Sequence, residues 1–201
     1  MCRYTIPVRW LRFAYKLPAA LLATVFFAAI PAVFRLVAPG RHRAVGRVGA
    51  LSCRLWGKTM CAILTVRREV LGPVPHDGAF LVASNHVSYL DILVLASLYP
   101  SLFLAKREIA SWPVFGWIAR GAGTVFIDRD QAKDVVRAGR ELSARLELDL
   151  PVTIFPEGKS SRGVAILPFQ PSLLEPAARA GVPGWAASIS YEAEGSTLPP
   201  S

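Results

Sequence analysis

Cysteine is scarce in this chain of 201 residues. The three cysteines, Cys2, Cys53 and Cys61, are odd in number and form no Cys-x-x-Cys spacing, which argues against a disulfide framework and against a zinc site. Cys53 and Cys61 stand eight residues apart in a helical pattern. We therefore expect buried thiols, no metal ion and a reducing environment that faces the cytosol.

Two nucleophile and phosphate signatures are missing. A hydrolase of the α/β type needs a Gly-x-Ser-x-Gly elbow, and the chain contains none. Gly57-Lys58-Thr59 and Gly158-Lys159-Ser160 resemble the end of a P-loop, but that motif also needs a glycine five positions earlier. Ser52 and Thr153 occupy those positions, so a P-loop nucleotidase is disfavoured.

Acidic residues are almost absent from the first third of the chain. Residues 1–70 hold 12 Lys and Arg against a single acid, Glu69, whereas residues 71–201 hold 11 basic and 13 acidic residues. Basic charge among apolar residues is typical of proteins that bind an anionic membrane surface. Nucleic acid is the competing partner, but no nucleic-acid-binding motif accompanies the charge, so we expect none.

One long apolar run lies within this basic third. Residues 17–34 carry no charge, and a helix of that length would measure roughly 27 Å, borderline for a bilayer. Pro18 and Pro31 lie near its ends, and Pro31 is expected to end or bend the helix. Basic residues flank both sides, so the positive-inside rule selects no orientation. An interfacial or re-entrant anchor is favoured, with a spanning helix and a signal peptide as alternatives; either anchor predicts attachment to a membrane, the inner membrane in a bacterium.

The remaining chain predicts an α/β fold with a largely parallel central sheet flanked by helices. A basic amphipathic helix is expected at 44–63, either lying on a membrane surface or covering the sheet. Expected strands are 64–70, 79–84, 101–105, 124–128, 152–155 and 185–190; expected helices are 89–98, 114–120, 131–148 and 172–180. These elements divide the chain into an anchoring region (1–63), a folded domain (64–194) and an irregular tail (195–201).

His86 and Asp91 are the clearest candidates for chemistry. His86 follows the apolar strand 79–84, at the end of a parallel strand where ligands usually bind. Residues five apart do not share a helix face, so the two side chains meet only if the helix begins between them. Ser88 predicts that start, as an N-cap with Asp91 at the third helical position. Asp91 could then orient His86 as a general base, although a capping box and a core histidine would explain the same residues.

Four blocks give the chain a more specific resemblance. Asn85-His86-Val87-Ser88-Tyr89-Leu90-Asp91 resembles the first signature, Asn-His-x-x-x-x-Asp, of the 1-acylglycerol-3-phosphate acyltransferase family. The other blocks follow in the family's order: residues 123–129, ending in Arg129; Phe155-Pro156-Glu157-Gly158; and Gly181-Val182-Pro183. The resemblance covers about residues 64–191 and favours the catalytic interpretation of the first block.

The resemblance implies a glycerolipid acyltransferase fold and transfer of an acyl group from acyl-CoA or acyl carrier protein to the hydroxyl of a lysolipid, with no cofactor. His86 would be the base and Asp91 its orienting carboxylate. Arg129 would bind the acceptor phosphate, and Glu157 and Gly158 would line the acceptor site. Two further basic residues of the same loop would either add to phosphate binding or remain solvated: Lys159 and Arg162.

Two departures from the family pattern concern the acceptor. Lys159 stands where the third block has threonine, and Trp185-Ala186-Ala187 stands where the fourth has a proline deeper in the strand. We expect 1-acylglycerol-3-phosphate as acceptor, with another lysolipid, such as lyso-ornithine lipid, as the alternative. A non-catalytic membrane protein that binds lipid phosphate is the third possibility. Members of the family extend beyond this point, so the chain is expected to be truncated.

Overall fold

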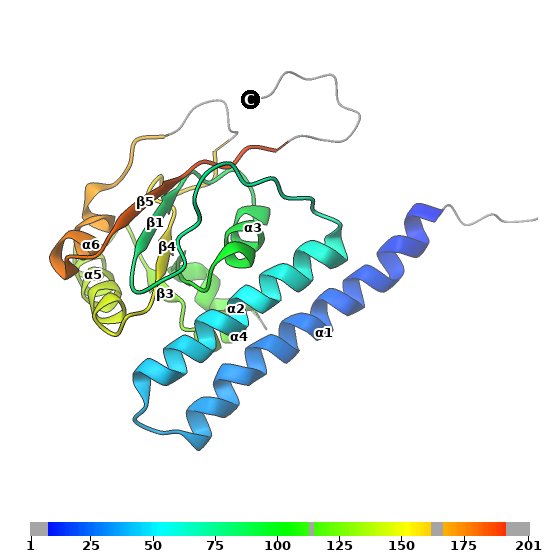
Figure 1. The fold of residues 1–201 in the computed structure, drawn as a ribbon, viewed down its shortest axis with the longest axis horizontal. Coiled ribbons are helices and arrows are strands. Elements are labelled where there is room, and N and C mark those ends of the chain that lie inside the picture. Colours follow the sequence, from blue (N-terminus) through cyan, green and yellow to red (C-terminus); the bar gives the residue numbers. More distant parts are fainter. Residues whose placement is uncertain (1–7, 113–114, 162–166, 192–201) are drawn as a thin grey trace, which may run out of the picture.

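The computed structural model describes residues 8–112, 115–161 and 167–191. Two long helices, α1 (Val8–Val37) and α2 (His42–Leu64), run in opposite directions as a hairpin along one side of the molecule (Figure 1). The amphipathic helix predicted at 44–63 is therefore present as α2. It packs on α1 and on α3 (Leu90–Leu98), so α2 lies between the outer helix and the α/β part of the chain.

A five-stranded sheet forms the centre of the α/β part. Its strands are β1 (Leu81–Ser84), β2 (Leu102–Lys106), β3 (Val125–Ile127), β4 (Val152–Ile154) and β5 (Gly184–Ala187). Their order is β3-β2-β4-β1-β5, and each neighbouring pair is parallel, which confirms the predicted fold class. The carboxyl ends of all five strands consequently lie at one edge, where α/β proteins place their ligands.

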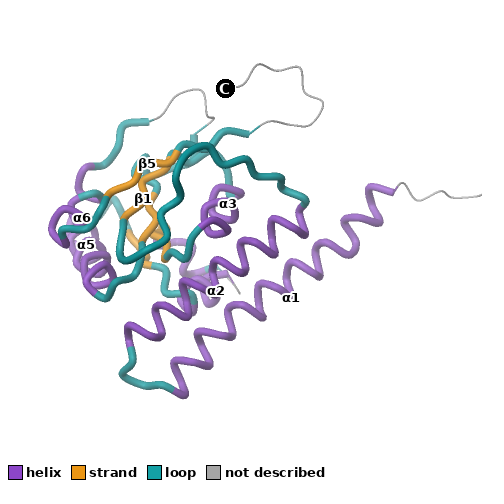
Figure 2. Tube along the Cα trace, in the orientation of Figure 1, coloured by secondary structure: helices purple, strands orange, loops and turns teal. Residues whose placement is uncertain are grey.

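Helices cover both faces of this sheet (Figure 2). On one face, α5 (Ala132–Glu147) and α6 (Glu175–Ala180) pack over Leu81, Ile127 and Ile154. On the other face, α3 and α2 pack over Phe80 and Val82. Burial on both faces explains why β1 to β4 are continuous apolar runs, whereas β5 at the sheet edge is partly exposed. The shorter elements are the 3-10 helices η1 (Arg107–Ser111) and η2 (Pro171–Leu173) and the helix α4 (Phe115–Gly121).

The strand predicted at 64–70 is wrong. Helix α2 continues through Leu64 and ends at Thr65, whose φ of 60° is left-handed, and residues 66–70 are irregular. Arg67, Arg68 and Glu69 are consecutive, so a strand there would place charge on both of its faces. A strand of this sheet must bury at least one face, which this segment cannot do.

Of the two outcomes expected at Pro31, an end or a bend of the helix, the end is wrong, because α1 continues to Val37. Pro31 has no N–H, so the carbonyl of Phe27, four residues earlier, lacks its helical donor. The hydroxyl of Ser52, from the neighbouring helix α2, donates to that carbonyl at 2.6 Å. The hairpin thus supplies from α2 the hydrogen bond that α1 cannot make, and the proline is accommodated.

The two cysteines of α2 are free thiols; Cys61 is buried, as predicted, whereas Cys53 is only partly buried. Burial raises the pKa of both thiols, that of Cys53 to about 12. Both therefore remain protonated at neutral pH and behave as small apolar side chains. Cys2 lies outside the described residues.

Candidate active site

The turn between β1 and α3 is built around the carboxylate of Asp91. This residue lies in the first turn of α3, and its Oδ2 accepts hydrogen bonds from the backbone N–H groups of Val87 (2.7 Å) and Ser88 (2.9 Å). The helix begins one residue later than the sequence predicts, with Tyr89 rather than Ser88 at the N-cap position. Ser88 still accepts from Leu90 N–H at 3.2 Å, but Asp91 holds the turn.

The same carboxylate orients His86. The Nδ1 atom of His86 lies 2.7 Å from Asp91 Oδ2, as the sequence argument required. Because an ionised carboxylate only accepts, Nδ1 carries the proton and Nε2 is left as an acceptor. Nε2 has no hydrogen-bond partner among the residues that the structure describes. The side chain of His86 is 15% exposed and that of Asp91 is 0% exposed, so only the histidine reaches solvent.

Asp91 stays ionised in this buried position. Burial alone would raise its pKa, but hydrogen bonds from His86, the amide of Ser88, Tyr191 and the amide of Val87 outweigh that effect, and the pKa lies below its ordinary value. Each of these donors stabilises the charged form. A permanently charged acceptor therefore faces Nδ1 of His86 across the neutral pH range.

Tyr191 is a member of this site that the sequence did not reveal. Its hydroxyl donates to Asp91 Oδ1 at 2.6 Å, from a position 100 residues further along the chain. Burial and the hydrogen bond to Asp91 both raise the pKa of Tyr191, so the phenol remains protonated. Asn85 fixes this segment, because its side-chain amide donates to the carbonyl of Ile189 at 2.9 Å and accepts from its N–H at 2.8 Å.

The loop after β4 packs against His86 from the other side. The ring of Phe155 stacks on the imidazole, with centroids 4.1 Å apart and planes 21° from parallel. Glu157 is buried and accepts from two backbone amides, that of His86 at 2.9 Å and that of Leu167 at 3.0 Å. The carboxylate of Glu157 therefore holds the backbone on either side of the site. The one signal for this in the sequence is its place in the Phe-Pro-Glu-Gly block.

Arg129 follows β3 and reaches the same loop. Its Nη1 donates to the carbonyl of Gly158 in a short hydrogen bond, and burial lowers the pKa of the guanidinium. The Nε atom of Arg129 is buried and has no hydrogen-bond partner among the residues that the structure describes. Gly158 has a φ of +82°, and a side chain there would lie 2.8 Å from Arg129 Nη1, so both its conformation and the arginine require glycine. A buried guanidinium donor without a partner is costly, which points to an anionic ligand.

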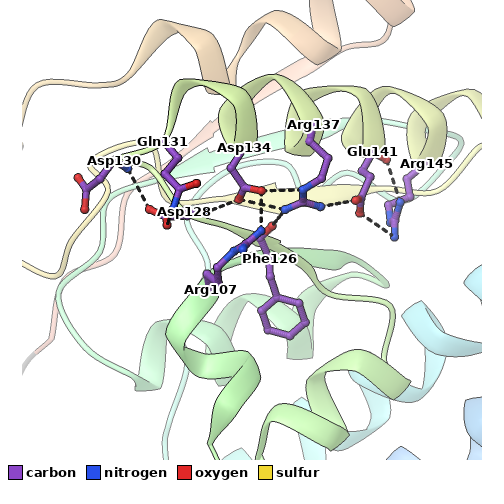
Figure 3. A network of polar contacts seen from close by, with 9 residues as sticks. All are labelled: Arg107, Phe126, Asp128, Asp130, Gln131, Asp134, Arg137, Glu141 and Arg145. Atoms are coloured by element: carbon purple, nitrogen blue, oxygen red, sulfur yellow. Dashed lines mark hydrogen bonds and ion pairs between the residues drawn. The ribbon is translucent and has the colours of Figure 1, made fainter.

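Asp128, which precedes Arg129 in the chain, has other partners (Figure 3). The carboxylate of Asp128 accepts from Gln131 Nε2 at 2.7 Å and from the backbone of Asp130 at 3.2 Å. Asp134, in the first turn of α5, accepts from the backbone of Asp128 and pairs with two arginines, Arg107 and Arg137. Among the described residues, no carboxylate forms an ion pair with Arg129.

The loop after β4 thus links five of the predicted residues by hydrogen bonds: His86, Asp91, Arg129, Glu157 and Gly158. Lys159 is exposed, and within the described part of the chain it makes no hydrogen bond or ion pair. Arg162 lies outside the described residues. Within residues 8–112, 115–161 and 167–191, no three His, Cys, Asp or Glu side chains are grouped as metal ligands. The arrangement defines a site that can take a proton from a hydroxyl beside a bound anion.

Comparison with known proteins gives the family. The sequence model of the acyltransferase family, described as "Acyltransferase", matches residues 66–190. The chain is 42% identical over 136 residues to a 1-acyl-sn-glycerol-3-phosphate acyltransferase of Neisseria gonorrhoeae, covering 67% of this chain and 53% of that protein. It is 37% identical over 127 residues to a lyso-ornithine lipid O-acyltransferase of Rhizobium meliloti (strain 1021), covering 63% and 44%.

The fold agrees with a solved structure. The crystal structure of the 1-acyl-sn-glycerophosphate (LPA) acyltransferase from Thermotoga maritima superposes with a TM-score of 0.58 at 26% identity, covering 84% of this chain and 73% of that one. The chain belongs to the acyltransferase family, which confirms the resemblance seen in its sequence. It spans about half the length of the curated relatives that it matches.

Proposed function

We propose that this protein transfers a fatty acyl group from an acyl thioester to the free hydroxyl of a lysolipid, with 1-acylglycerol-3-phosphate as the favoured acceptor. The observation that carries the proposal is the juxtaposition at one sheet edge of two features. One is a histidine whose Nε2 is open and whose Nδ1 is held by a buried aspartate. The other is a half-buried arginine whose Nε is buried and has no partner among the described residues. The first can activate a hydroxyl, and the second can bind the phosphate that accompanies it.

In this mechanism His86 acts through Nε2. The acceptor hydroxyl gives its proton to Nε2 as its oxygen attacks the thioester carbonyl. Asp91 stabilises the imidazolium that forms, as the carboxylate of a serine-protease triad does. The tetrahedral intermediate collapses with cleavage of the carbon–sulfur bond, and the thiolate takes the proton back from Nε2. The products are an ester and a free thiol, and His86 regains its starting state.

The remaining residues position these groups. Arg129 offers its free guanidinium donors to the acceptor phosphate, while its Nη1 stays on Gly158. Glu157 supports the backbone of His86, so its role is to hold the loop that carries Phe155 and Gly158. Lys159 and Arg162 add positive charge to the same loop for phosphate binding. Tyr191 holds the second oxygen of Asp91.

Lyso-ornithine lipid is the second candidate acceptor. Four relatives with that printed activity match this chain at 34–41% identity. Arg129 does not separate the candidates, because a guanidinium binds a carboxylate as readily as a phosphate. Two relatives named as 1-acyl-sn-glycerol-3-phosphate acyltransferases reach 41–42% sequence identity, and they favour the phosphate acceptor.

The helical hairpin is the proposed membrane anchor, corresponding to residues 1–63. Within α1, Ala14–Val37 is long and apolar enough to cross a membrane by its length and composition. Large apolar side chains of α1 are exposed, among them Leu22 (72%), Phe26 (62%) and Leu36 (80%), and Leu51 and Leu55 of α2 are exposed too. Apolar surface on both helices favours a hairpin that lies in the membrane interface, with the active site of domain 64–194 facing the cytosol.

Purified full-length protein in mixed micelles tests the proposed reaction. Radiolabelled palmitoyl-CoA or palmitoyl acyl carrier protein would be offered with 1-acylglycerol-3-phosphate, lyso-ornithine lipid, lysophosphatidylcholine or no acceptor. The expected result is labelled phosphatidate as the main product, with the better donor read from the same assay. Faster labelling of lyso-ornithine lipid would favour the second acceptor. The absence of any acceptor-dependent product with either donor would contradict the proposal.

A further inference from the structure

A cavity lies at the edge of the sheet opposite the candidate active site. Its volume is about 400 Å³, within the range of small-ligand sites. Leu102, Gly123 and Leu150 line it, at the positions where β2, β3 and β4 begin. Because the strands are parallel, their starting ends lie at the edge away from His86 and Arg129. This cavity is therefore separate from the candidate active site.

The lining combines apolar walls with basic residues. Val45, Leu148 and Leu150 are among the apolar residues, and the charged or titratable residues of the lining are all basic: Arg35, Arg41, His42 and Arg145. The guanidinium groups of Arg35 and Arg41 make no hydrogen bond or ion pair within the described residues. The nearby carboxylate of Asp149 does not neutralise them, because it already accepts from two other arginines of α2, Arg43 and Arg47.

Arg145 brings a further cation toward Arg35. It projects from the last turn of α5, donates to the carbonyl of Glu141 at 3.0 Å and approaches that residue's carboxylate only to 3.7 Å. Burial lowers the pKa of Arg145, Glu141 raises it, and the charge of Arg35 lowers it further. Glu141 is shared with Arg137. Two guanidinium groups from distant helices thus repel each other beside an apolar cavity, and an anion between them would relieve this repulsion.

We propose that this cavity binds one anionic phospholipid, with its phosphate among Arg35, Arg41 and Arg145 and its first chain carbons against Val45, Leu148 and Leu150. The apolar walls favour a lipid over free phosphate. The cavity also lies beside the proposed membrane anchor. Arg35 belongs to the last turn of the apolar helix α1, next to the exposed Leu36 and Val37. Basic residues at the end of an apolar helix meet anionic headgroups. Binding here does not depend on the proposed catalysis, so loss of acyl transfer would leave it intact.

Native mass spectrometry of the full chain in a neutral detergent can count the bound lipid. The probe is dioctanoyl phosphatidylglycerol, compared with dioctanoyl phosphatidylcholine and with inorganic phosphate. All titrations use an Arg129→Gln background, so that the candidate active site contributes no phosphate contact. The expected result is saturable binding of a single phosphatidylglycerol, with weaker binding of the zwitterionic lipid and none of phosphate. Equal binding of inorganic phosphate would contradict a lipid site, and binding of many lipids without saturation would indicate surface attraction only.

Variants separate the cavity from general basic charge. Replacing both Arg35 and Arg145 by Gln should weaken phosphatidylglycerol binding by about tenfold or more, since hydrogen bonds to charged groups are lost. Arg43→Gln is the matched control: it removes a charge from α2, leaves Asp149 paired with Arg47, and lies outside the lining. Ala144→Trp fills the cavity from an exposed position of α5 without changing charge, and it should also abolish binding. Equal loss in Arg43→Gln, or unchanged binding in Ala144→Trp, would overturn the proposal.

Discussion

Two aspartates at the carboxyl edge of the sheet both accept hydrogen bonds from backbone N–H groups. Asp91 lies in the first turn of α3 after β1, and Asp134 lies in the first turn of α5 after β3. Each accepts hydrogen bonds from the loop before its helix: Asp91 from Val87 and Ser88, Asp134 from Asp128. A carboxylate in this position satisfies amides that the helix leaves open and benefits from the helix dipole.

Their other partners differ, and that difference assigns their roles. Asp134 pairs at 2.7 Å with the permanent cations Arg107 and Arg137. Asp91 instead accepts from His86 and Tyr191, side chains that ordinarily carry no charge at neutral pH. A carboxylate fixed by arginines can only stabilise a loop, whereas one that holds a histidine can stabilise a new positive charge during a reaction. Both residues lie in the first turn of a helix, so their position in the helix alone does not distinguish these roles.

The largest effect is expected from His86→Ala. This change removes the proposed base and leaves Asp91 with its amide and tyrosine partners. Loss of a general base typically lowers the rate by about 10²–10⁴-fold, and we expect kcat for labelled acyl transfer to fall within that range. His76→Ala is a suitable control, because His76 is exposed on a loop and should leave kcat unchanged. Wild-type activity in His86→Ala would exclude the catalytic role.

The next effect concerns Arg129 and the acceptor. Arg129→Gln removes the charge that would face the acceptor phosphate, and hydrogen bonds to charged groups contribute about 1.5–3 kcal/mol each. We expect KM for 1-acylglycerol-3-phosphate to rise by about tenfold or more, while KM for the acyl donor changes little. Arg140→Gln on the outer face of α5 is the matched control. Equal increases in both Michaelis constants would argue against a phosphate contact.

Tyr191→Phe is expected to have a smaller effect with a distinctive pH dependence. The hydroxyl of Tyr191 lowers the pKa of Asp91, so its removal leaves a more basic carboxylate. A more basic carboxylate stabilises the imidazolium formed in the reaction more strongly, and the imidazolium returns its proton less readily. We expect kcat at neutral pH to fall several-fold and the acid limb of the kcat profile to move to higher pH.

Tyr99→Phe provides the control for this shift. Tyr99 is buried and contacts Thr153 in the core, so the same change there alters packing without touching Asp91. Its acid limb should stay in place. An acid limb that does not move in Tyr191→Phe would leave this tyrosine with a purely structural role.

The Asp134 network predicts an effect on stability. Hydrogen bonds from Arg137 and from the amide of Asp128, together with the charge of Arg107, outweigh burial and hold the pKa of Asp134 well below its ordinary value. A carboxyl group with a lowered folded pKa stabilises the protein above its unfolded pKa of about 3.9 and loses that contribution as the pH falls. Asp134→Asn should therefore lower Tm by a few degrees at pH 7, and the difference from wild type should shrink toward pH 3. A constant difference across this range would contradict the assignment.

Patterns along the chain predicted six strands, and five are present. Four of them, β1 to β4, were recognisable because strands buried on both faces are continuous apolar runs. They also predicted the meeting of His86 and Asp91, which depends only on where one helix begins. They missed Tyr191, since its contact with Asp91 depends on β5 lying beside β1. They also placed a strand at 64–70, although the consecutive charges of Arg67, Arg68 and Glu69 argue against one there. They allowed the helix to end at Pro31, because the Ser52 donor on α2 is not visible in the local sequence.

The most direct test sets the two aspartates side by side in one experiment. Asp91→Asn and Asp134→Asn would be compared for kcat of acyl transfer and for Tm by thermal unfolding. In Asp91→Asn, a neutral amide replaces the carboxylate and no longer stabilises the imidazolium that forms on His86, so kcat should fall by about 10²-fold or more while the protein stays folded. Asp134→Asn should lower Tm and leave kcat of the folded protein near that of wild type. Full activity in Asp91→Asn, or an equal loss of kcat in both variants, would contradict the distinction between them.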